Sequence, residues 1–172
     1  MKITKSELKG MIREALGEEL RLRESSIESN TITDALDKAL RASERAAKRG
    51  IGSTPNVLIS TQPGRGVITT CHSWAQNNNI DIRIVDCTKI DDIPSFMSDT
   101  LRYGKGHVLV LDNYDRATPK VRAGLLTVIN ENSCGQLFTV AIAVGRNDSN
   151  ELQVGYPINS AERSQFEISV RA

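Results

Sequence analysis

Short apolar runs alternate with amphipathic stretches along most of this chain. Four runs have the length and composition of strands buried in a parallel sheet, and they cover residues 56–60, 82–87, 107–111 and 137–144. Between them, apolar residues recur at helical spacing, which predicts helices over residues 67–76, over 93–103 and from 119 onward. Strands and helices in this alternation predict an α/β fold with right-handed crossovers.

Another helix is expected before the first strand, over residues 32–49. Its apolar positions fall on one side, and Gly50 follows as a natural stop.

The apolar side of this predicted helix therefore consists of Ala35, Leu36, Ala39, Leu40 and Ala46. A helix with one such side is expected to lie on a face of the sheet, which completes a doubly wound arrangement.

The first thirty residues predict a separate amphipathic helix followed by a linker. Residues 4–7 have the form of a capping box, so a helix should begin at Lys5. Its apolar stripe comprises Leu8, Ile12, Leu16 and Leu20. Gly10 and Gly17 each cost about 1 kcal/mol relative to Ala, so the helix is stable only when the stripe is buried.

The stripe either packs on its own domain or binds a partner. The polar residues 24–30 have the composition of a linker, which slightly favours a partner. The Lys-rich opening also resembles those of phage-encoded small proteins. We therefore divide the chain into an N-terminal helix with its linker, residues 1–30, and an α/β domain, residues 31–172.

Composition narrows the class of protein. The chain has 22 Lys and Arg against 21 Asp and Glu, a balance that argues against a dedicated nucleic-acid or membrane surface. Its 3 cysteines lack C-x-x-C spacing and predict reduced thiols in the cytoplasm. With only His72 and His107 present, a metal cluster or a His-based triad is not expected. We find no apolar run long enough for a signal peptide or a membrane span.

Two polar residues follow the apolar run that ends at Leu111. Asp112 stands where a buried strand would end, and ligands collect at that edge of open α/β sheets. A carboxylate there can hold Mg²⁺ through water. Asn113 can form hydrogen bonds but cannot take a proton from an attacking water. The segment thus predicts a nucleotide site poorly suited to hydrolysis, and the alternative is an Asp-Asn turn after a core strand.

The loop after the first strand carries a second candidate motif. Residues 62–68 resemble the Walker A pattern G-x-x-x-x-G-K-[ST], in the P-G-x-G-K-[ST] form used by the AAA+ ATPases. The residues that match are Pro63, Gly64 and Gly66. Those that differ are Thr61 at the first Gly, Val67 at the Lys and Ile68 at the hydroxyl residue.

Val67 and Ile68 remove a charge and a metal ligand from the pattern. The Lys neutralises the β- and γ-phosphates and the hydroxyl binds Mg²⁺, so only backbone N–H groups and a helix N-terminus remain. Thr69 comes one residue late, about 100° around the helix, and should not reach the same place. Arg65 is able to approach a phosphate from the loop, although an exposed loop Arg is the simpler interpretation.

Later segments continue the resemblance to AAA+ proteins. Asp112 and Asn113 resemble the Walker B motif, with Asn113 at the position of its catalytic Glu. Residues 116–131 resemble the segment after Walker B, in which a loop leads to a helix with paired Leu residues. Thr118 suits the N-cap and Pro119 the first helical position. The family carries a γ-phosphate sensor after the strand that follows, and this position falls on Arg146 or Asn147.

Near the C-terminus the resemblance places an arginine finger just before a Phe. Gln165 occupies that position, and Arg163 lies two residues away, where a solvated surface Arg is the preferred interpretation. The resemblance covers residues 32–172, is most like the MoxR-like and general AAA+ core, and lacks the C-terminal helical lid. It implies a three-layer P-loop NTPase-like sandwich around a parallel five-stranded sheet of order 5-1-4-3-2.

The same resemblance implies ATP and Mg²⁺ as possible but weak ligands, and a protein partner or an AAA+ ring. The expected nucleotide-binding residues are Pro63, Gly64, Arg65, Gly66, Val67, Ile68, Asp112, Asn113 and Asn147, with Asp112 as the Mg²⁺ ligand. No catalytic residue is expected, because Asn113 and Gln165 replace the catalytic Glu and the arginine finger.

Three functional hypotheses follow. The domain is a catalytically degenerate AAA+ subunit with a structural or regulatory role, an active ATPase with non-standard catalytic residues, or a nucleotide-independent protein-interaction module. Loss of one catalytic group can slow an NTPase by several orders of magnitude. Since four such groups are replaced here, the first and third hypotheses are favoured over the second.

Overall fold

One parallel sheet forms the centre of the molecule. The computed structural model describes residues 29–50, 55–62, 64–102, 104–144 and 156–172, and the structural statements below concern these ranges. The strands are β1 (Val57–Thr61), β2 (Ile82–Asp86), β3 (Val108–Asp112), β4 (Phe138–Val144) and β5 (Ile168–Arg171). They lie in the order β2-β3-β4-β1-β5, and all four pairings are parallel. The predicted order 5-1-4-3-2 is confirmed.

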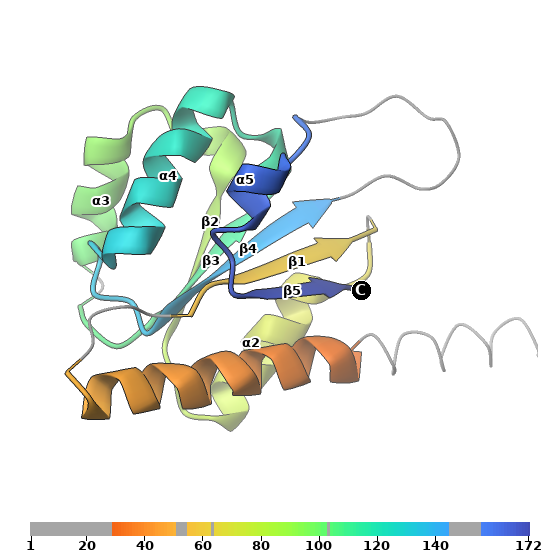
Figure 1. Ribbon diagram of the computed structural model, residues 1–172, viewed down its shortest axis with the longest axis vertical. Coiled ribbons are helices and arrows are strands. Elements are labelled where there is room, and N and C mark those ends of the chain that lie inside the picture. Colours follow the sequence, from red (N-terminus) through yellow and green to blue (C-terminus); the bar gives the residue numbers. More distant parts are fainter. Residues whose placement is uncertain (1–28, 51–54, 63, 103, 145–155) are drawn as a thin grey trace, which may run out of the picture.

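Helices cover both faces of this sheet, which gives the three predicted layers (Figure 1). The helix over residues 29–48 and α2 (Val67–Asn77) lie on one face. The helices α3 (Ile93–Leu101), α4 (Pro119–Glu131) and α5 (Ser160–Arg163) lie on the other. Two short 3₁₀ helices, η1 (Cys87–Lys89) and η2 (Tyr114–Arg116), follow β2 and β3 directly.

The central strands are mostly apolar because each one contributes to two cores. Successive side chains of a strand point to opposite faces. In β1, Val57 and Ile59 join the core under the helix over residues 29–48 and α2, while Leu58 joins the core under α3 and α4. The strands β3 and β4 alternate in the same way. This double burial explains why the sequence shows continuous apolar runs rather than alternation.

Trp74 anchors the first of these cores. Its side chain is buried, and its ring meets Phe138 edge-on at a centroid distance of 5.9 Å. The indole Nε1 donates a hydrogen bond of 2.8 Å to Oδ1 of Asp37, so its polar atom is satisfied at the edge of the core. Leu36 and Ala39 are buried in the same core. Trp74 is therefore a core residue.

Several element boundaries differ from prediction. Residues 29 and 30 are helical, so they belong to the helix over residues 29–48 and not to a linker. Cys87 was expected to end a strand but begins η1, where Asp86 caps the turn by accepting from Thr88 N. The helix α3 ends at Leu101, two residues before the predicted end. The predicted N-terminal amphipathic helix lies outside the described residues.

Candidate functional site

The loop between β1 and α2 has the backbone form of a turn into a helix. Gly64 and Gly66 have φ values of 80° and 68°, a region that favours glycine. Gly66 is the N-cap of α2 and supplies no side-chain cap, so the first N–H groups of the helix are left without an intrahelical partner. Arg65 is partly exposed and donates to Gln62 Oε1 at 3.1 Å. Pro63 lies outside the described residues.

The residues at the Lys and hydroxyl positions of the Walker A pattern pack into the protein. Val67 is 5% exposed and belongs to the core that contains Trp74. Ile68 is partly buried against the same core. Thr69 is exposed, whereas the hydroxyl of Thr70 donates to Gly66 O at 3.2 Å. The side chains at these two positions thus stabilise the fold and offer a phosphate neither charge nor hydroxyl.

The Walker B-like residues lie at the carboxyl edge of the sheet, as predicted. Asp112 ends β3, and Asp86 ends β2 directly beside it in the strand register. Asn113 has φ 52° and connects the two carboxylates. Its Nδ2 donates to Asp112 Oδ2 at 3.2 Å and to Asp86 Oδ1 at 3.4 Å, while its backbone N donates to Asp112 Oδ1 at 2.9 Å. All these polar groups are half-buried.

Asp86 was not predicted to belong to this site. Thr88 donates to its Oδ1 from the hydroxyl at 2.7 Å and from the backbone N at 3.1 Å, and Lys89 Nζ lies 3.4 Å from Oδ2. These hydrogen bonds, led by the Thr88 hydroxyl, lower the pKa of Asp86. The signal in the sequence was its position at a strand end, since parallel strands bring their carboxyl ends to one edge.

A buried polar cluster lies behind the Walker B-like residues, formed by Tyr114, Arg122 and Glu162. The Tyr114 hydroxyl donates to Glu162 Oε1 at 3.0 Å, and Arg122 Nη1 lies 3.4 Å from Glu162 Oε2. The Arg122 and Glu162 side chains are 7% and 8% exposed. The cluster therefore joins η2, α4 and α5 through one buried ion pair, which the sequence did not reveal.

Asp115, in η2, connects this 3₁₀ helix to the end of β4 by a hydrogen bond. Its Oδ1 accepts from Val144 N at 3.0 Å, and burial raises the pKa of its carboxyl. The sensor position expected after β4, on Arg146 or Asn147, lies outside the described residues.

The residue at the arginine-finger position forms local hydrogen bonds. Gln165 is exposed, and its Oε1 accepts from Asn130 Nδ2 at 3.0 Å, while its Nε2 donates to Ala161 O at 3.5 Å. Arg163, the alternative, is exposed at the end of α5. The neutral amide of Gln165 links α5 to α4 and brings no positive charge to this surface.

The residues at the sheet edge fit a Mg²⁺–nucleotide complex poorly. Mg²⁺ takes six oxygen ligands at about 2.0–2.1 Å, whereas both oxygens of Asp112 already accept from Asn113. Within the described ranges, no group of three or more His, Cys, Asp or Glu residues is placed to hold a metal ion. The backbone N–H groups at the start of α2 are the remaining feature suited to an anion.

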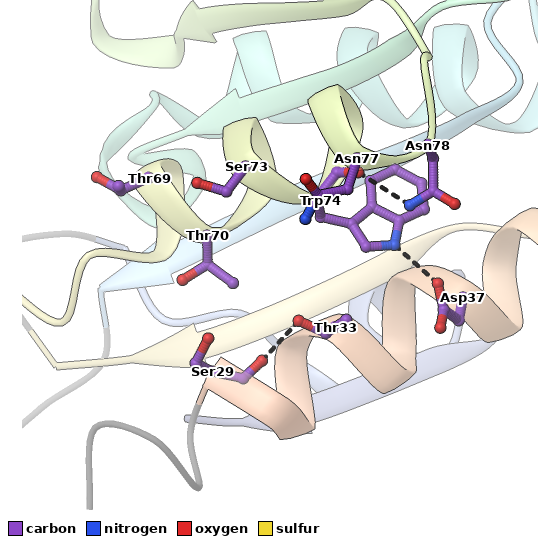
Figure 2. A pocket seen from close by; sticks show the side chains of 9 residues that line it. All are labelled: Ser29, Thr33, Asp37, Thr69, Thr70, Ser73, Trp74, Asn77 and Asn78. Atoms are coloured by element: carbon purple, nitrogen blue, oxygen red, sulfur yellow. Dashed lines mark hydrogen bonds between the residues drawn. The ribbon is translucent and has the colours of Figure 1, made fainter. Parts of the chain in front are cut away.

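Two grooves lie away from this edge. One, of about 450 Å³, runs between α2 and the helix over residues 29–48 (Figure 2). Apart from Trp74, it is lined by short polar side chains, namely Ser29, Thr33, Asp37, Thr69, Thr70, Ser73, Asn77 and Asn78. The other, of about 370 Å³, lies between α4 and α5 and includes Arg122, Glu162 and Gln165. Of the predicted nucleotide-binding residues that the structure describes, none lines either groove.

Comparison with solved structures finds a similar fold in a branch migration motor. The chain matches RuvB of Thermotoga maritima, described as a Holliday junction branch migration motor, with 25% identity and a TM-score of 0.56 over 81% of this chain and 44% of that one. Two variants of that RuvB match similarly, with 26% and 25% identity, TM-scores of 0.55, and coverage of 81% and 83% of this chain and 44% and 45% of theirs. No family model and no curated protein matches the chain.

These matches support an AAA+ domain. RuvB is an AAA+ P-loop ATPase, and the five-stranded parallel sheet with its helices has the arrangement of that fold. The chain spans less than half of the RuvB structures that it matches. In the described part of the chain, we find no helix of the length and apolar character that crossing a membrane requires.

Proposed function

We propose that this AAA+ domain does not hydrolyse ATP, binds nucleotide weakly or not at all, and serves as a structural or regulatory module through a protein partner or an oligomeric ring. The observation that carries the proposal is the burial of Val67. At the position of the phosphate-binding Lys stands an apolar side chain, 5% exposed and packed in the core. Electrostatic stabilisation of the transferred phosphoryl group dominates catalysis in P-loop NTPases, so the loss of this charge is severe.

Two further positions support the proposal. Asn113 cannot take a proton from water, and its amide is engaged with Asp86 and Asp112. Gln165 is neutral and is hydrogen-bonded to its own surroundings. With Val67, this makes three separate positions that lack a group able to accept a proton or to stabilise negative charge during hydrolysis.

Weak nucleotide binding remains compatible with the loop. Gly64 and Gly66 have positive φ and form the turn that leads into α2. At the N-terminus of this helix, backbone N–H groups and the helix dipole favour anions. We therefore expect residual binding through backbone groups around residues 64–68, with Arg65 as a possible contributor. Dependence on Mg²⁺ should be modest, because Ile68 offers no hydroxyl and Asp112 is engaged.

The decisive experiment pairs steady-state ATPase measurements with titration of a fluorescent ATP analogue, each with and without Mg²⁺. We expect no hydrolysis above buffer controls and weak binding that changes little with Mg²⁺. A turnover that is lost in Asp112→Ala would contradict the proposal and favour an active ATPase with non-standard residues. Complete lack of binding would contradict only the expected residual binding and would favour the nucleotide-independent interaction module.

The role named for RuvB is not carried over to this chain. A branch migration motor depends on DNA, whereas this chain is close to electrically neutral, with a formal charge of +1. We propose a protein partner for this reason, in the cytoplasm, where reduced thiols such as the buried Cys71, Cys87 and Cys134 persist. A MoxR-like relationship and a phage origin remain hypotheses that rest on sequence resemblance.

A further inference from the structure

The two carboxylates at the sheet edge create an electrostatic problem. Asp86 and Asp112 are paired across adjacent strands, which lie about 4.8 Å apart in a sheet. Like charges this close repel each other, and the repulsion is stronger where they are half-buried. Something between them must supply positive charge or hydrogen-bond donors. A divalent cation is one solution, since it is held by carboxylate oxygens.

Asn113 supplies the donors in this protein. Its side-chain nitrogen reaches both carboxylates, at 3.2 Å for Asp112 and 3.4 Å for Asp86. The opposite orientation of the amide would place its oxygen against two anions, so the hydrogen-bond network itself assigns the nitrogen to this side. The left-handed backbone, φ 52°, is one that Asn tolerates better than most residues.

Further donors engage the oxygens of both carboxylates. Asp86 also accepts two hydrogen bonds from Thr88 and pairs with Lys89. Asp112 accepts from the backbone N of Asn113 in addition to the side chain. A cation that bridged the two residues would have to displace the Asn113 amide and overcome the nearby Lys89 charge.

We propose that the Asn113 amide is a built-in substitute for a divalent cation between Asp86 and Asp112, and that it closes this edge of the sheet to Mg²⁺. The inference deepens the proposed function and rests on it for the assignment of this edge as the former Mg²⁺ position. It concerns the nucleotide-free protein, so it is tested without ATP.

The test measures Mn²⁺ binding to the full chain by the electron paramagnetic resonance signal of free Mn²⁺, with Mg²⁺ as competitor. Asn113→Gly removes the amide and keeps a residue suited to positive φ. Asn79→Gly is the matched control, because Asn79 has φ 54° and precedes the opposite end of β2. We expect Asn113→Gly to bind Mn²⁺ at least tenfold more tightly than the unaltered chain and the control, and to lose this gain when Asp86→Asn is added.

Thermal unfolding provides an independent measurement on the same proteins. Mn²⁺ should raise the midpoint of Asn113→Gly in a concentration-dependent way and leave the unaltered chain and the control unchanged. If Asn113→Gly fails to fold, Asn113→Asp replaces it. This variant keeps the shape of the side chain, turns the donor into an acceptor, and should require Mn²⁺ or Mg²⁺ for full stability.

Two results would overturn the inference. One is equal Mn²⁺ affinity in the unaltered chain and in Asn113→Gly, which would mean that the amide does not close the site. The other is a folded Asn113→Asp whose affinity for Mn²⁺ does not exceed that of the unaltered chain. Failure of the proposed function is a different result. A chain that hydrolyses ATP contradicts that proposal whatever the Mn²⁺ data, whereas an unaltered chain that binds Mn²⁺ as tightly as Asn113→Gly but hydrolyses no ATP contradicts only this inference.

Discussion

Gly124 lies in the middle of α4 where this helix meets the start of α3. A Cβ atom at this position would lie 2.4 Å from Cγ1 and 2.9 Å from Cδ1 of Ile93. Glycine inside a helix costs about 1 kcal/mol relative to Ala. The close approach of the two helices thus gives a physical reason for a residue that helix propensity alone disfavours.

We expect Gly124→Ala to lower the free energy of unfolding by about 1–3 kcal/mol, because overpacking outweighs the gain in helix propensity. Urea unfolding measures this change. Ala123→Gly, at the exposed neighbouring position, is the control and should lose only about 1 kcal/mol from propensity. Adding Ile93→Ala should recover part of the loss in Gly124→Ala. Strictly additive effects of the two substitutions would contradict the steric explanation.

The buried carboxyl of Asp115 makes stability depend on pH. Burial raises its pKa above the usual value, so the folded state holds this proton more tightly than the unfolded state does. The contribution of Asp115 to the free energy of unfolding therefore falls as the pH rises above about 4, the pKa of this carboxyl in the unfolded chain, and passes its raised pKa in the folded state.

Asp115→Asn should remove this loss, because the amide oxygen can still accept from Val144 N without a buried charge. We expect a higher unfolding midpoint than in the unaltered chain at pH 7 and no difference at about pH 3, below the carboxyl's unfolded pKa. Calorimetry across this range provides the measurement. A difference of the same size at every pH would show that the charge is not responsible.

At the scale of elements, periodicity predicted the regular structure and missed the short turns. Buried strands such as β3 and amphipathic helices such as α4 have strong local signals, and Thr118 caps α4 as expected by accepting from Val121 N. The turns η1 and η2 and the short helix α5 were not predicted. A contact between distant residues connects η2 and α5, because the Tyr114 hydroxyl donates to Glu162 across 48 positions of sequence. In η1 the cap is local, from Asp86 to Thr88 N, within residues that were expected to continue a strand.

The candidate site divides in the same way. The end of an apolar run correctly predicted that Asp112 lies at the sheet edge, and the glycine pattern correctly predicted that Gly66 lies at the start of α2. The sequence did not reveal that Asp86 would share the amide of Asn113, because sheet order and register decide which strand ends become neighbours. Nor did it show that Val67 would pack inward, since the direction of a side chain in the first turn depends on the loop before it.

The burial of Val67 yields a prediction for α2. Val67→Lys should destabilise the domain by about 2 kcal/mol or more. The ammonium group cannot be buried without a partner, and turning the long side chain outward would remove the packing of Val67. Thr69→Lys, on the exposed side of the same turn, is the control and should be nearly neutral. Urea unfolding and titration with a fluorescent ATP analogue provide the measurements.

The same position tests the nucleotide hypothesis when Val67→Lys is combined with Ile68→Thr. If this double variant folds and binds the ATP analogue more tightly in the presence of Mg²⁺, the loop has kept the shape of a phosphate cradle. If it folds and binds no better, the loop is not such a cradle, and the interaction-module hypothesis gains support.

The ion pair between Arg122 and Glu162 holds α5 against α4. Glu162→Ala should cost about 3–5 kcal/mol, because it leaves a buried guanidinium without its counter-ion. The double variant Arg122→Met with Glu162→Leu should be close to the unaltered chain, since it removes both charges and keeps apolar volume. Chemical unfolding of the single and double variants measures the coupling. A double variant as unstable as Glu162→Ala would contradict this account.

At the scale of the whole molecule, the sheet carries two separate cores, and the helix over residues 29–48 closes one of them. Ile32, Leu36 and Ala39 of this helix are buried against the sheet, so the helix is part of the α/β domain. The predicted amphipathic helix of the first twenty residues has a different basis for stability, because it combines a leucine stripe with two glycines. Such a stripe requires a surface to cover it, supplied by a partner, a second copy or the domain itself.

Removal of residues 1–28 should leave the domain folded and weaken its self-association or its binding to a partner. The cut falls before Ser29 because residues 29 and 30 are helical and precede the core position Ile32. Thermal unfolding and light scattering of the truncated and full-length chains measure the two effects. Truncation through residue 40 is the contrasting variant, which should unfold because it removes Ile32 and Leu36 from the core. A large fall in midpoint at unchanged mass after removal of residues 1–28 would show instead that the leucine stripe packs on its own domain.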